Sequence, residues 1–363
     1  MRPIFVTTVQ TDEFTQAASV AFDYAFTGSS AFEGWEKPSI PEDFGIGLIM
    51  GPSGSGKSLL LKQFGDEVLP VWDPSKAIVS QFSTPEDSLE RLMAVGLNSI
   101  PSWCRPFHVL SNGEQFRANL ARRLDNNTII DEFTSVVDRN VAKAVSSSLR
   151  RYVDRKGLKG LVLASCHHDI LEWLRPDWYF DTTDGLLHDG RLLRRPPIEI
   201  RIYPCKRSAW SVFAKHHYLT DSLNGSCRSY LATAKFDGEE ETIVGFASSL
   251  PQPSGHFKNG YREHRTVILP DFQGLGLGPK VSDMVAQLHI DEGKRYFSKT
   301  AHPRFGTYRD RSQLWKPTSH YKKAQKGKEV GRLGFGDTRT CFAHEYIGKR
   351  TPDWLDELSD SVV

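Results

Sequence analysis

Short apolar runs recur along the first half of the chain, and each run ends in a glycine-rich, acidic or histidine segment. The runs are Gly47-Leu48-Ile49-Met50, Thr128-Ile129-Ile130 and Leu161-Val162-Leu163-Ala164-Ser165. Runs of this length and aliphatic composition are typical of parallel strands buried on both faces. Leu59, Leu60, Leu61 and Phe64 predict a helix after the first run. We therefore predict an α/β fold with a parallel sheet in this half.

The second half combines strand patterns with one amphipathic helix. Ile198-Glu199-Ile200-Arg201-Ile202 alternates apolar and charged residues, and residues 265–269 and 295–300 are also strand-like. Between the latter two, apolar residues recur at helical spacing behind Pro279, which suits a first helical turn. These positions are Val281, Met284, Val285 and Leu288. The order predicts a second, mixed α/β domain.

Charge is divided unevenly along the 363 residues. Residues 1–189 hold 18 Lys or Arg against 25 Asp or Glu, residues 190–350 hold 28 against 15, and residues 351–363 hold none against 4. The net charges are −7, +13 and −4. A cationic run ending in Pro196-Pro197 marks the seam. We predict a first domain over 1–189, a second over 190–350 and an acidic tail over 351–363.

Composition limits the class of protein. No apolar run is long enough to span a bilayer, and the first residues lack the apolar stretch of a secretion signal. The five cysteines are widely spaced and form no Cys-x-x-Cys pair, which argues against a zinc site or a disulfide framework. We therefore expect a cytoplasmic protein with no membrane span.

The first apolar run leads into Gly51-Pro52-Ser53-Gly54-Ser55-Gly56-Lys57-Ser58, which fits the phosphate-binding P-loop pattern. Glycines let successive backbone N–H groups turn inward around phosphate oxygens at a helix N-terminus. Lys57 would reach the outer phosphates, and Ser58 would bind Mg²⁺. The predicted ATP contacts here are Gly51, Ser53, Gly54, Ser55, Gly56, Lys57 and Ser58.

Asp131 and Glu132 follow the second apolar run. The carboxyl edge of a parallel sheet would bring these acids to the same site as the P-loop. We predict that Asp131 holds Mg²⁺ through water and that Glu132 polarises the water that attacks ATP. The alternative is a strand that simply ends in solvated acids.

Leu110-Ser111-Asn112-Gly113-Glu114 resembles the LSGGQ signature of ABC ATPases and departs from it at Asn112 and Glu114. Ser111 and Gly113 would offer hydrogen-bond donors to an anion at a helix start. In that family the partner copy's signature completes each ATP site. A chain with one P-loop and one signature therefore implies a homodimer that sandwiches ATP between two copies.

The resemblance to ABC ATPases covers about residues 15–185 and implies further site residues. Gln81 would be the Q-loop residue that contacts Mg²⁺, residues 135–138 would form the D-loop, and His168 would be the switch histidine, with His167 as a rival. The aromatic A-loop residue could be Tyr24 or Phe26. The short spacings on either side of Gln81 leave little room for a transporter's helical subdomain. This favours a soluble ABC protein, with a separate membrane subunit left open.

Gln273-Gly274-Leu275-Gly276-Leu277-Gly278 resembles motif A of the GNAT acyltransferase superfamily. A glycine turn between a strand and a helix presents N–H groups to the pyrophosphate of coenzyme A. The resemblance implies acetyl-CoA or a related acyl-CoA as donor, bound by Leu269, Gln273, Gly274, Leu275, Gly276, Leu277 and Gly278. A dinucleotide would instead require an acidic residue at the end of the following strand, which residues 295–300 lack.

The GNAT resemblance also implies acid–base residues. Glu263 and His264 precede the motif A strand, where a base for the acceptor amine often lies, and Tyr308 follows the next strand, where an acid for the leaving thiolate often lies. The usual Asn and Tyr-x-x-x-Gly-Phe ending is replaced by Ala301-His302-Pro303-Arg304, so this is a divergent member.

Residues 210–219, WSVFAKHHYL, allow two interpretations. Trp210, Phe213 and His217 share one helical face, which is typical of a packed helix. The segment also weakly resembles the His-His-Tyr segment of proteins related to the phage Mom DNA-modification enzyme. In that case His216, His217 and Tyr218 would border an acceptor pocket.

We predict an ABC ATPase fused to a GNAT-like acyltransferase that modifies a nucleic-acid base or a nucleic-acid-bound amine. The basic second domain supports this, with a cluster around Tyr321 made of Lys322, Lys323, Lys326, Lys328 and Arg332. One alternative is an ATP-regulated acetyltransferase for a protein or small molecule. Another is a DNA-remodelling ATPase whose GNAT domain only binds.

Overall fold

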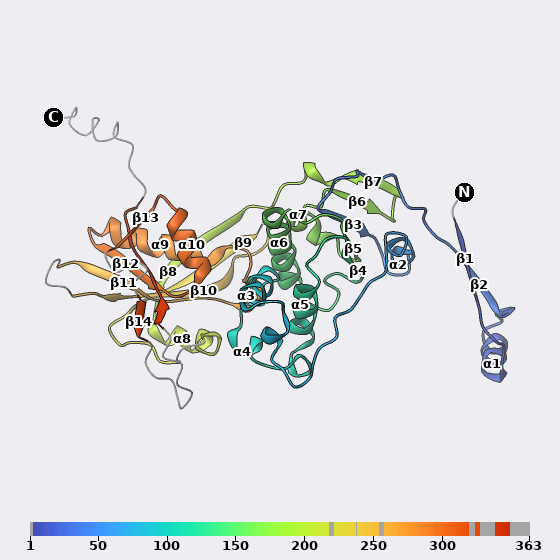
Figure 1. Cartoon of the computed structure of the whole chain (residues 1–363), viewed down its shortest axis with the longest axis horizontal. Coiled ribbons are helices and arrows are strands. Elements are labelled where there is room, and N and C mark those ends of the chain that lie inside the picture. The colour runs from blue at the N-terminus through green and yellow to red at the C-terminus, as the bar shows by residue number, and fades with distance from the viewer. Residues whose placement is uncertain are drawn as a thin grey trace. The chain divides into compact units, whose positions relative to one another are not determined.

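The computed structural model describes residues 3–217, 221–236, 238–253, 258–318, 324–326 and 338–348. The chain divides into two compact units, Met1–Arg195 and Pro196–Val363. Each unit has its own sheet and its own buried apolar cluster (Figure 1). Both units mix helices with strands, which confirms the predicted α/β fold class.

A five-stranded sheet forms the centre of unit 1, in the order β4-β5-β3-β6-β7. Its strands are β4 (Ile129–Ile130), β5 (Leu161–Ser165), β3 (Ile46–Met50), β6 (Trp178–Asp181) and β7 (Leu186–Asp189). The first four are parallel, and every residue of β3 and β5 is buried, as their apolar sequences predict. The segments that follow these four strands therefore meet at one edge of the sheet.

Apart from one N-terminal helix described below, the helices of unit 1 contribute buried residues to the same apolar clusters as the sheet. They are α2 (Lys57–Leu61), α3 (Pro85–Ala94), α4 (Ile100–Trp103), α5 (Asn112–Arg122), α6 (Arg139–Lys156) and α7 (Leu171–Leu174). The Asp138 side chain caps the start of α6, and Gly157 ends it in a left-handed conformation. α2 is shorter than predicted: it stops before Phe64, which stacks on Trp178 instead. No helix in the described ranges is long and apolar enough to cross a membrane.

A small antiparallel pair precedes the central sheet of unit 1. It consists of β1 (Ile4–Thr8) and β2 (Ser29–Glu33), with α1 (Glu13–Ala21) between them. Asp12 caps α1 by accepting the Thr15 N–H (2.9 Å). No residue of α1 is buried, so this helix contributes nothing to the core.

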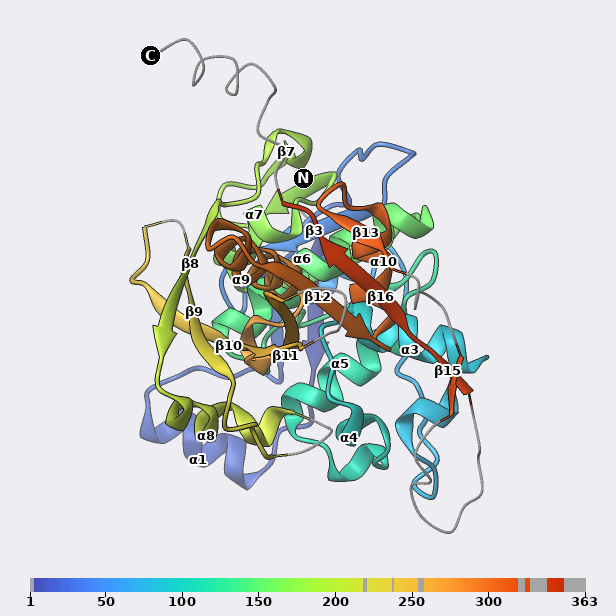
Figure 2. The same cartoon turned by 90° about the vertical axis from the view of Figure 1, so that its left-hand side faces the viewer.

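A seven-stranded sheet forms the centre of unit 2, in the order β13-β16-β12-β11-β10-β9-β8 (Figure 2). Its strands are β8 (Ile198–Cys205), β9 (Arg228–Phe236), β10 (Thr242–Pro251), β11 (Gly260–Ile268), β12 (Arg295–Thr300), β13 (Trp315–Pro317) and β16 (Phe342–Tyr346). β14 (Ala324–Lys326) and β15 (Thr338–Thr340) pair separately. The strands predicted around residues 198–202, 265–269 and 295–300 are confirmed.

β11 and β12 run parallel, and the two strands separate after a short paired stretch. In the described residues they pair from Gly260↔Arg295 to Arg262↔Phe297. We call the point just beyond, at Glu263 and Ser298, the fork.

His264 forms a bulge in β11. It is an extra residue in the β10–β11 ladder, because the adjacent residues Ser248 and Ser249 of β10 pair with Arg265 and Glu263, on either side of it. α9 (Leu277–Asp291) follows β11, α10 (Pro303–Arg311) follows β12, and α8 (Trp210–Phe213) precedes β9.

Candidate functional site

The P-loop forms a turn that requires glycine. Gly51, Gly54 and Gly56 have φ angles of +139°, +76° and +86°, which residues with a side chain rarely adopt. A Cβ at Gly51 would lie 1.9 Å from Thr182 Oγ1. Thr182 Oγ1 also donates to Ser55 Oγ (2.7 Å) and so ties the loop to the segment after β6. The glycine φ angles and the Thr182–Ser55 hydrogen bond therefore hold the P-loop in its shape.

The P-loop offers the groups that a nucleoside triphosphate needs. The N-cap of α2 is Gly56, which offers no side chain to the N–H groups that open the helix. Lys57 Nζ donates to Pro52 O (2.7 Å) and lies over its own loop. Ser53 and Ser58 belong to the same turn and helix start. These groups fit a phosphate chain with Mg²⁺, and the individual ATP contacts remain predictions.

The parallel strands bring the other predicted ATPase residues to the edge that carries the P-loop. Asp131 and Glu132 follow β4, and His168 follows β5 in the 3₁₀ turn His168–Ile170. Glu132 has φ +48°, and its N–H donates to Asp131 Oδ1 (2.8 Å). A left-handed conformation at a residue other than glycine is costly and tends to occur at functional sites. The strain at Glu132 supports its predicted role.

Glu67 is an acidic neighbour of this edge that no sequence pattern singles out. Glu67 Oε1 accepts the Asp131 N–H (3.2 Å), and the same carboxylate pairs with Arg123. No motif surrounds Glu67, and it is far from Asp131 along the chain. Only the tertiary structure places it beside the predicted magnesium ligand.

His168, not His167, has the freedom expected of a switch histidine. The His168 side chain is 54% exposed, and its Nδ1 lies 3.9 Å from Asp181 Oδ2 at the end of β6. The His167 backbone N–H donates to Ser165 Oγ (3.2 Å), and burial followed by the charge of Arg139 lowers the pKa of the His167 side chain. The geometry therefore favours His168.

Two predicted ATP contacts bind groups of the protein itself. Gln81 Oε1 accepts the Asp73 N–H (2.8 Å), and Gln81 Nε2 donates to the carbonyl of Asp73 (3.1 Å). Ser111 donates to Glu114 Oε2 from both its N–H and its hydroxyl (3.0 Å each). Gly113 packs on Val137 of the predicted D-loop. Contact of Gln81 with Mg²⁺, or of Ser111 with a phosphate, requires these hydrogen bonds to open.

The aromatic residues beside the P-loop are Phe32 and Trp35. A Cβ at Gly56 would lie 2.7 Å from Phe32 Cε1, and Trp35 Nε1 donates to Ser55 O (2.8 Å). Tyr24 and Phe26, the candidates from the sequence, stack on each other instead, with ring centres 6.4 Å apart. Phe32 and Trp35 are therefore the better candidates for contact with a base.

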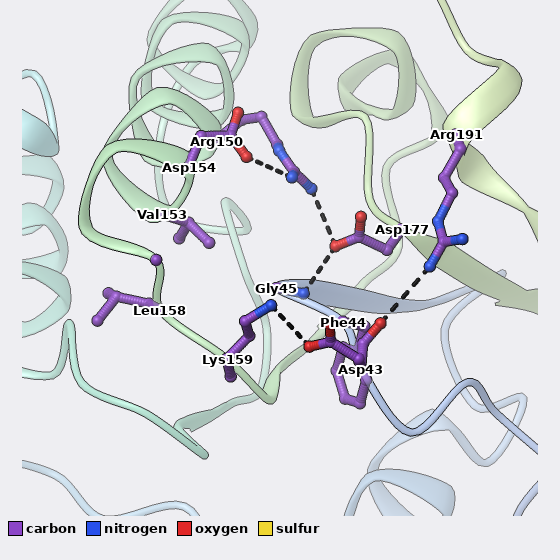
Figure 3. Close-up of a pocket in the computed structure, with 11 residues that line it drawn as sticks. Asp43, Phe44, Gly45, Arg150, Val153, Asp154, Leu158, Lys159, Asp177 and Arg191 are labelled. Carbon is purple, nitrogen blue, oxygen red and sulfur yellow. Dashed lines mark hydrogen bonds and ion pairs between the residues drawn. The ribbon is translucent and has the colours of Figure 1, made fainter.

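A pocket of about 300 Å³ lies at the opposite edge of this sheet, at the start of β3 and β6 (Figure 3). Most of its charged side chains pair with one another, and Arg191 donates to the backbone carbonyl of Asp43 (3.5 Å). Arg150 donates to Asp177 Oδ2 (3.1 Å), and Lys159 Nζ lies 2.6 Å from Asp43 Oδ1. Because these charges are neutralised within the protein, the lining favours a structural role over ligand binding.

The glycine turn of unit 2 fits a pyrophosphate group. Gly276 is the N-cap of the 15-residue helix α9, with φ +82° and no side-chain cap, and Gly274 has φ +101°. The backbone N–H groups and the positive end of the helix favour an anion at this turn. Gln273 Nε2 donates to Ile268 O (2.9 Å) and closes the turn. Leu275 and Leu277 are buried and anchor it.

Glu263 is enclosed by four hydrogen-bond donors. Thr266 Oγ1 (2.7 Å) and Ser282 Oγ (3.0 Å) donate to Oε1. Ser298 Oγ (2.6 Å) and Arg309 (2.7 Å) donate to Oε2. A carboxylate has about four lone-pair positions, so all of them are used. Burial raises the Glu263 pKa, but Arg309 and the hydroxyls outweigh it and lower the pKa. This favours a structural role over the predicted role of base.

His264 has different neighbours. Its Nε2 accepts the Asn224 N–H (3.4 Å). Burial, then the charges of Arg265, Arg262 and His217, lower its pKa to about 4. The imidazole is therefore neutral at pH 7 and a weak base, and its Nε2 can accept a proton only when the hydrogen bond from Asn224 opens. His217, from the segment predicted to border the acceptor, thus lies close enough to affect the predicted base.

Tyr308 donates its hydroxyl hydrogen bond to Asp283, which also accepts from Trp315 Nε1 (2.8 Å). Burial and the bond to Asp283 raise the Tyr308 pKa. To protonate a thiolate, as predicted, Tyr308 would have to leave Asp283.

Some predicted features lie outside the described residues. They are Tyr218, Tyr321, Lys322, Lys323, Lys328, Arg332 and the tail 351–363, and only the backbone of Lys326 is described, in β14. Within the described ranges, His, Cys, Asp and Glu side chains form no group of three that could hold a metal ion.

His289 predicts a pH dependence of stability. It is fully buried, bonded to Ser249 Oγ (2.8 Å) and stacked on Tyr261 (4.5 Å), and burial lowers its pKa to about 4. The unfolded chain takes up the proton near pH 6.5 and the folded chain does not, so stability falls as the pH drops from about 6.5 to 4. Urea unfolding should show a loss between pH 7 and pH 5 that is about 2 kcal/mol larger in the wild type than in His289→Gln, in which His264 still contributes its own loss. Equal pH slopes for both proteins would contradict this assignment.

Residues 168–307 match the acetyltransferase (GNAT) family. The match begins after β5, ends within α10 and contains the glycine turn, Glu263 and His264. The C-terminal part of the chain therefore carries a GNAT acetyltransferase domain, as motif A predicted. A search of curated proteins found no match for this chain.

Similar solved structures fall into two groups. The dimeric structure of MJ0796, a bacterial ABC transporter cassette, is 17% identical and covers 45% of this chain and 93% of its own, with a TM-score of 0.33. A GNAT family acetyltransferase from Elizabethkingia anophelis with acetyl-CoA bound is 15% identical and covers 41% and 98%, with a TM-score of 0.30. Spermidine N-acetyltransferase from Vibrio cholerae with CoA and spermine is 8% identical and covers 40% and 94%, with a TM-score of 0.30.

Proposed function

We propose that this chain is an ABC-type ATPase joined to an acyl-CoA-dependent N-acyltransferase whose acceptor is an amine on, or bound to, nucleic acid. One observation carries the acyltransferase part. A glycine turn with positive φ angles at Gly274 and Gly276 opens a 15-residue helix beside a sheet fork within the residues that match the GNAT family. Such a turn can hold the pyrophosphate of an acyl-CoA.

For unit 1 we propose ATP hydrolysis at the edge formed by the ends of β3, β4 and β5. The P-loop would hold the phosphates, Ser58 and Asp131 would hold Mg²⁺, and Glu132 would orient the attacking water. A second copy would supply Ser111, so the active species is a homodimer. The common edge of the parallel strands supports this proposal.

The charges around His264 support a phosphate-bearing acceptor. Arg262, Arg265 and His217 all act on His264, and residues 190–350 carry a net charge of +13. Cationic surroundings attract nucleic acid and repel a polycationic acceptor such as a polyamine. An acceptor base would have to leave its stack to reach His264, at a cost of a few kcal/mol.

We expect the full-length protein to bind DNA or RNA with an affinity that falls steeply with salt. Each phosphate contact on duplex DNA contributes about −0.9 to the log–log slope. Fluorescence anisotropy with both nucleic acids measures this slope. Arg262→Gln, which removes an exposed cation beside His264, should make the slope shallower by about 1. Lys159→Gln in unit 1 is the control. A flat response with both nucleic acids would favour a protein or small-molecule acceptor.

A second candidate is a DNA-remodelling ATPase whose GNAT domain binds acyl-CoA without transferring the acyl group. The hydrogen bonds of Glu263 and Tyr308 favour it, because these two of the three predicted proton-transfer groups already have protein partners. Incubation with labelled acetyl-CoA and nucleic acid separates the two. Label on the nucleic acid supports transfer, and tight binding without transfer supports the second candidate.

A further inference from the structure

One buried side chain, Arg309 of α10, fills the fork between β11 and β12. It is 1% exposed. Its Nη1 donates to Ser298 Oγ (2.6 Å), and its Nη2 donates to Glu263 Oε2 (2.7 Å) and Ser282 Oγ (2.9 Å). Glu263 and Ser298 are the first residues beyond the paired part of the two strands. The guanidinium therefore bridges both strands and α9 where the strands separate.

Side-chain bonds take the place of backbone pairing at the fork. Ser298 Oγ donates to Glu263 Oε2 (2.6 Å), and Arg309 reaches both of these residues. Buried polar groups need partners, and the guanidinium supplies five donors in one fixed plane. A lysine would keep the charge but would place all its donors on one nitrogen, so it could not bridge the same groups with the same geometry.

Aromatic rings connect Arg309 to the glycine turn. The guanidinium carbon lies 4.5 Å from the ring centre of Trp315 and 5.1 Å from that of Phe305. Phe305 in turn packs on Gly278, where a Cβ would lie 3.1 Å from Phe305 Cζ. Arg309 thus contacts the fork directly and the start of α9 through one ring.

We propose that Arg309 is a positioning residue of the acyltransferase site, which holds the fork open and fixes the bulge that directs His264 toward Asn224. Arg309 lies beyond the residues that match the GNAT family, so the match itself assigns it no role. The fixed carboxylate of Glu263 gives the neighbouring bulge a defined orientation. The inference rests on the proposed acyltransferase function.

The test compares Arg309→Lys with Arg311→Lys in the full-length protein. Arg311 is an exposed residue of the same helix and is therefore a matched control. Lysine preserves the charge, so a change at His264 reports geometry. In Arg309→Lys we expect the His264 pKa, measured by NMR of histidine ring protons, to rise from about 4 by about one unit or more. The Kd for CoA, measured by calorimetry, should increase about tenfold or more. Arg311→Lys should change neither quantity.

A lower melting temperature with an unchanged His264 titration and unchanged CoA affinity would overturn the proposal, because Arg309 would then only stabilise the fold. If Arg309→Lys does not fold, Glu263→Gln replaces it, since it keeps the shape of the fork residue and should weaken CoA binding by a similar factor. If the wild-type protein binds no CoA, the proposed acyltransferase function fails. The His264 titration still decides the role of Arg309 in that case.

Discussion

Replacing Glu132 with Gln is expected to lower steady-state ATP turnover by about 100-fold or more while ATP still binds. Gln keeps the shape at this left-handed position after β4 but cannot polarise the attacking water. Lys57→Ala should lose affinity for ATP as well, because it removes the charge over the outer phosphates. Phosphate release and equilibrium ATP binding measure the two effects. Lys62→Ala, an exposed residue at the end of α2, is the control.

The Glu132→Gln protein should also accumulate as an ATP-bound homodimer, because ATP that is not hydrolysed keeps the two copies together. Light scattering at micromolar concentration with ATP and Mg²⁺ detects it. A strictly monomeric Glu132→Gln protein would refute the dimer. Unchanged turnover in both Lys57→Ala and Glu132→Gln would refute the ATPase assignment.

The site edge of unit 1 could be predicted from the sequence because its geometry follows from strand direction. The apolar runs at 47–50, 128–130 and 161–165 predict buried parallel strands, and all three are present. Once they are parallel, the P-loop, Asp131 and His168 must meet at one edge. The P-loop glycines likewise predict positive φ angles, which Gly51, Gly54 and Gly56 adopt.

The hydrogen bonds around that edge could not be predicted, because they depend on residues distant in sequence. Glu67 lies beside Asp131 without any local motif. Gln81 is the predicted Q-loop residue, and its side-chain amide binds the backbone of Asp73. Phe32 reaches the P-loop because β2 pairs with β1, a contact that no short pattern predicts.

In unit 2 the sequence located the glycine turn but could not distinguish the roles of Glu263 and His264. Both precede the same turn, and a bulge disrupts the alternation by which strand residues face opposite sides. The structure binds Glu263 to α9, β12 and α10, and leaves His264 beside Asn224. Arg309, which binds Glu263 and so distinguishes it from His264, lies in α10, and this helix begins well after the glycine turn in the sequence.

Bulky substitution in the glycine turn is the prediction with the largest expected effect in unit 2. Gly276→Val should raise the Kd for CoA by about 100-fold or more, because φ +82° is strained for valine and the N–H groups would no longer converge on the pyrophosphate. Each charge-assisted hydrogen bond contributes about 1.5–3 kcal/mol, so the loss of two accounts for this factor. Gly278→Leu should act similarly, because its side chain would press on Phe305, 3.1 Å from the new Cβ.

Gly293→Val provides the matched control for backbone strain. Gly293 has φ +71° at the other end of α9, and a Cβ there would meet nothing within 4 Å. This variant should lose stability like Gly276→Val but keep its affinity for CoA. Calorimetry with CoA and thermal unfolding of all three variants separate strain from binding. Equal loss of CoA affinity in Gly276→Val and Gly293→Val would mean that strain alone weakens binding and that the turn does not hold the pyrophosphate.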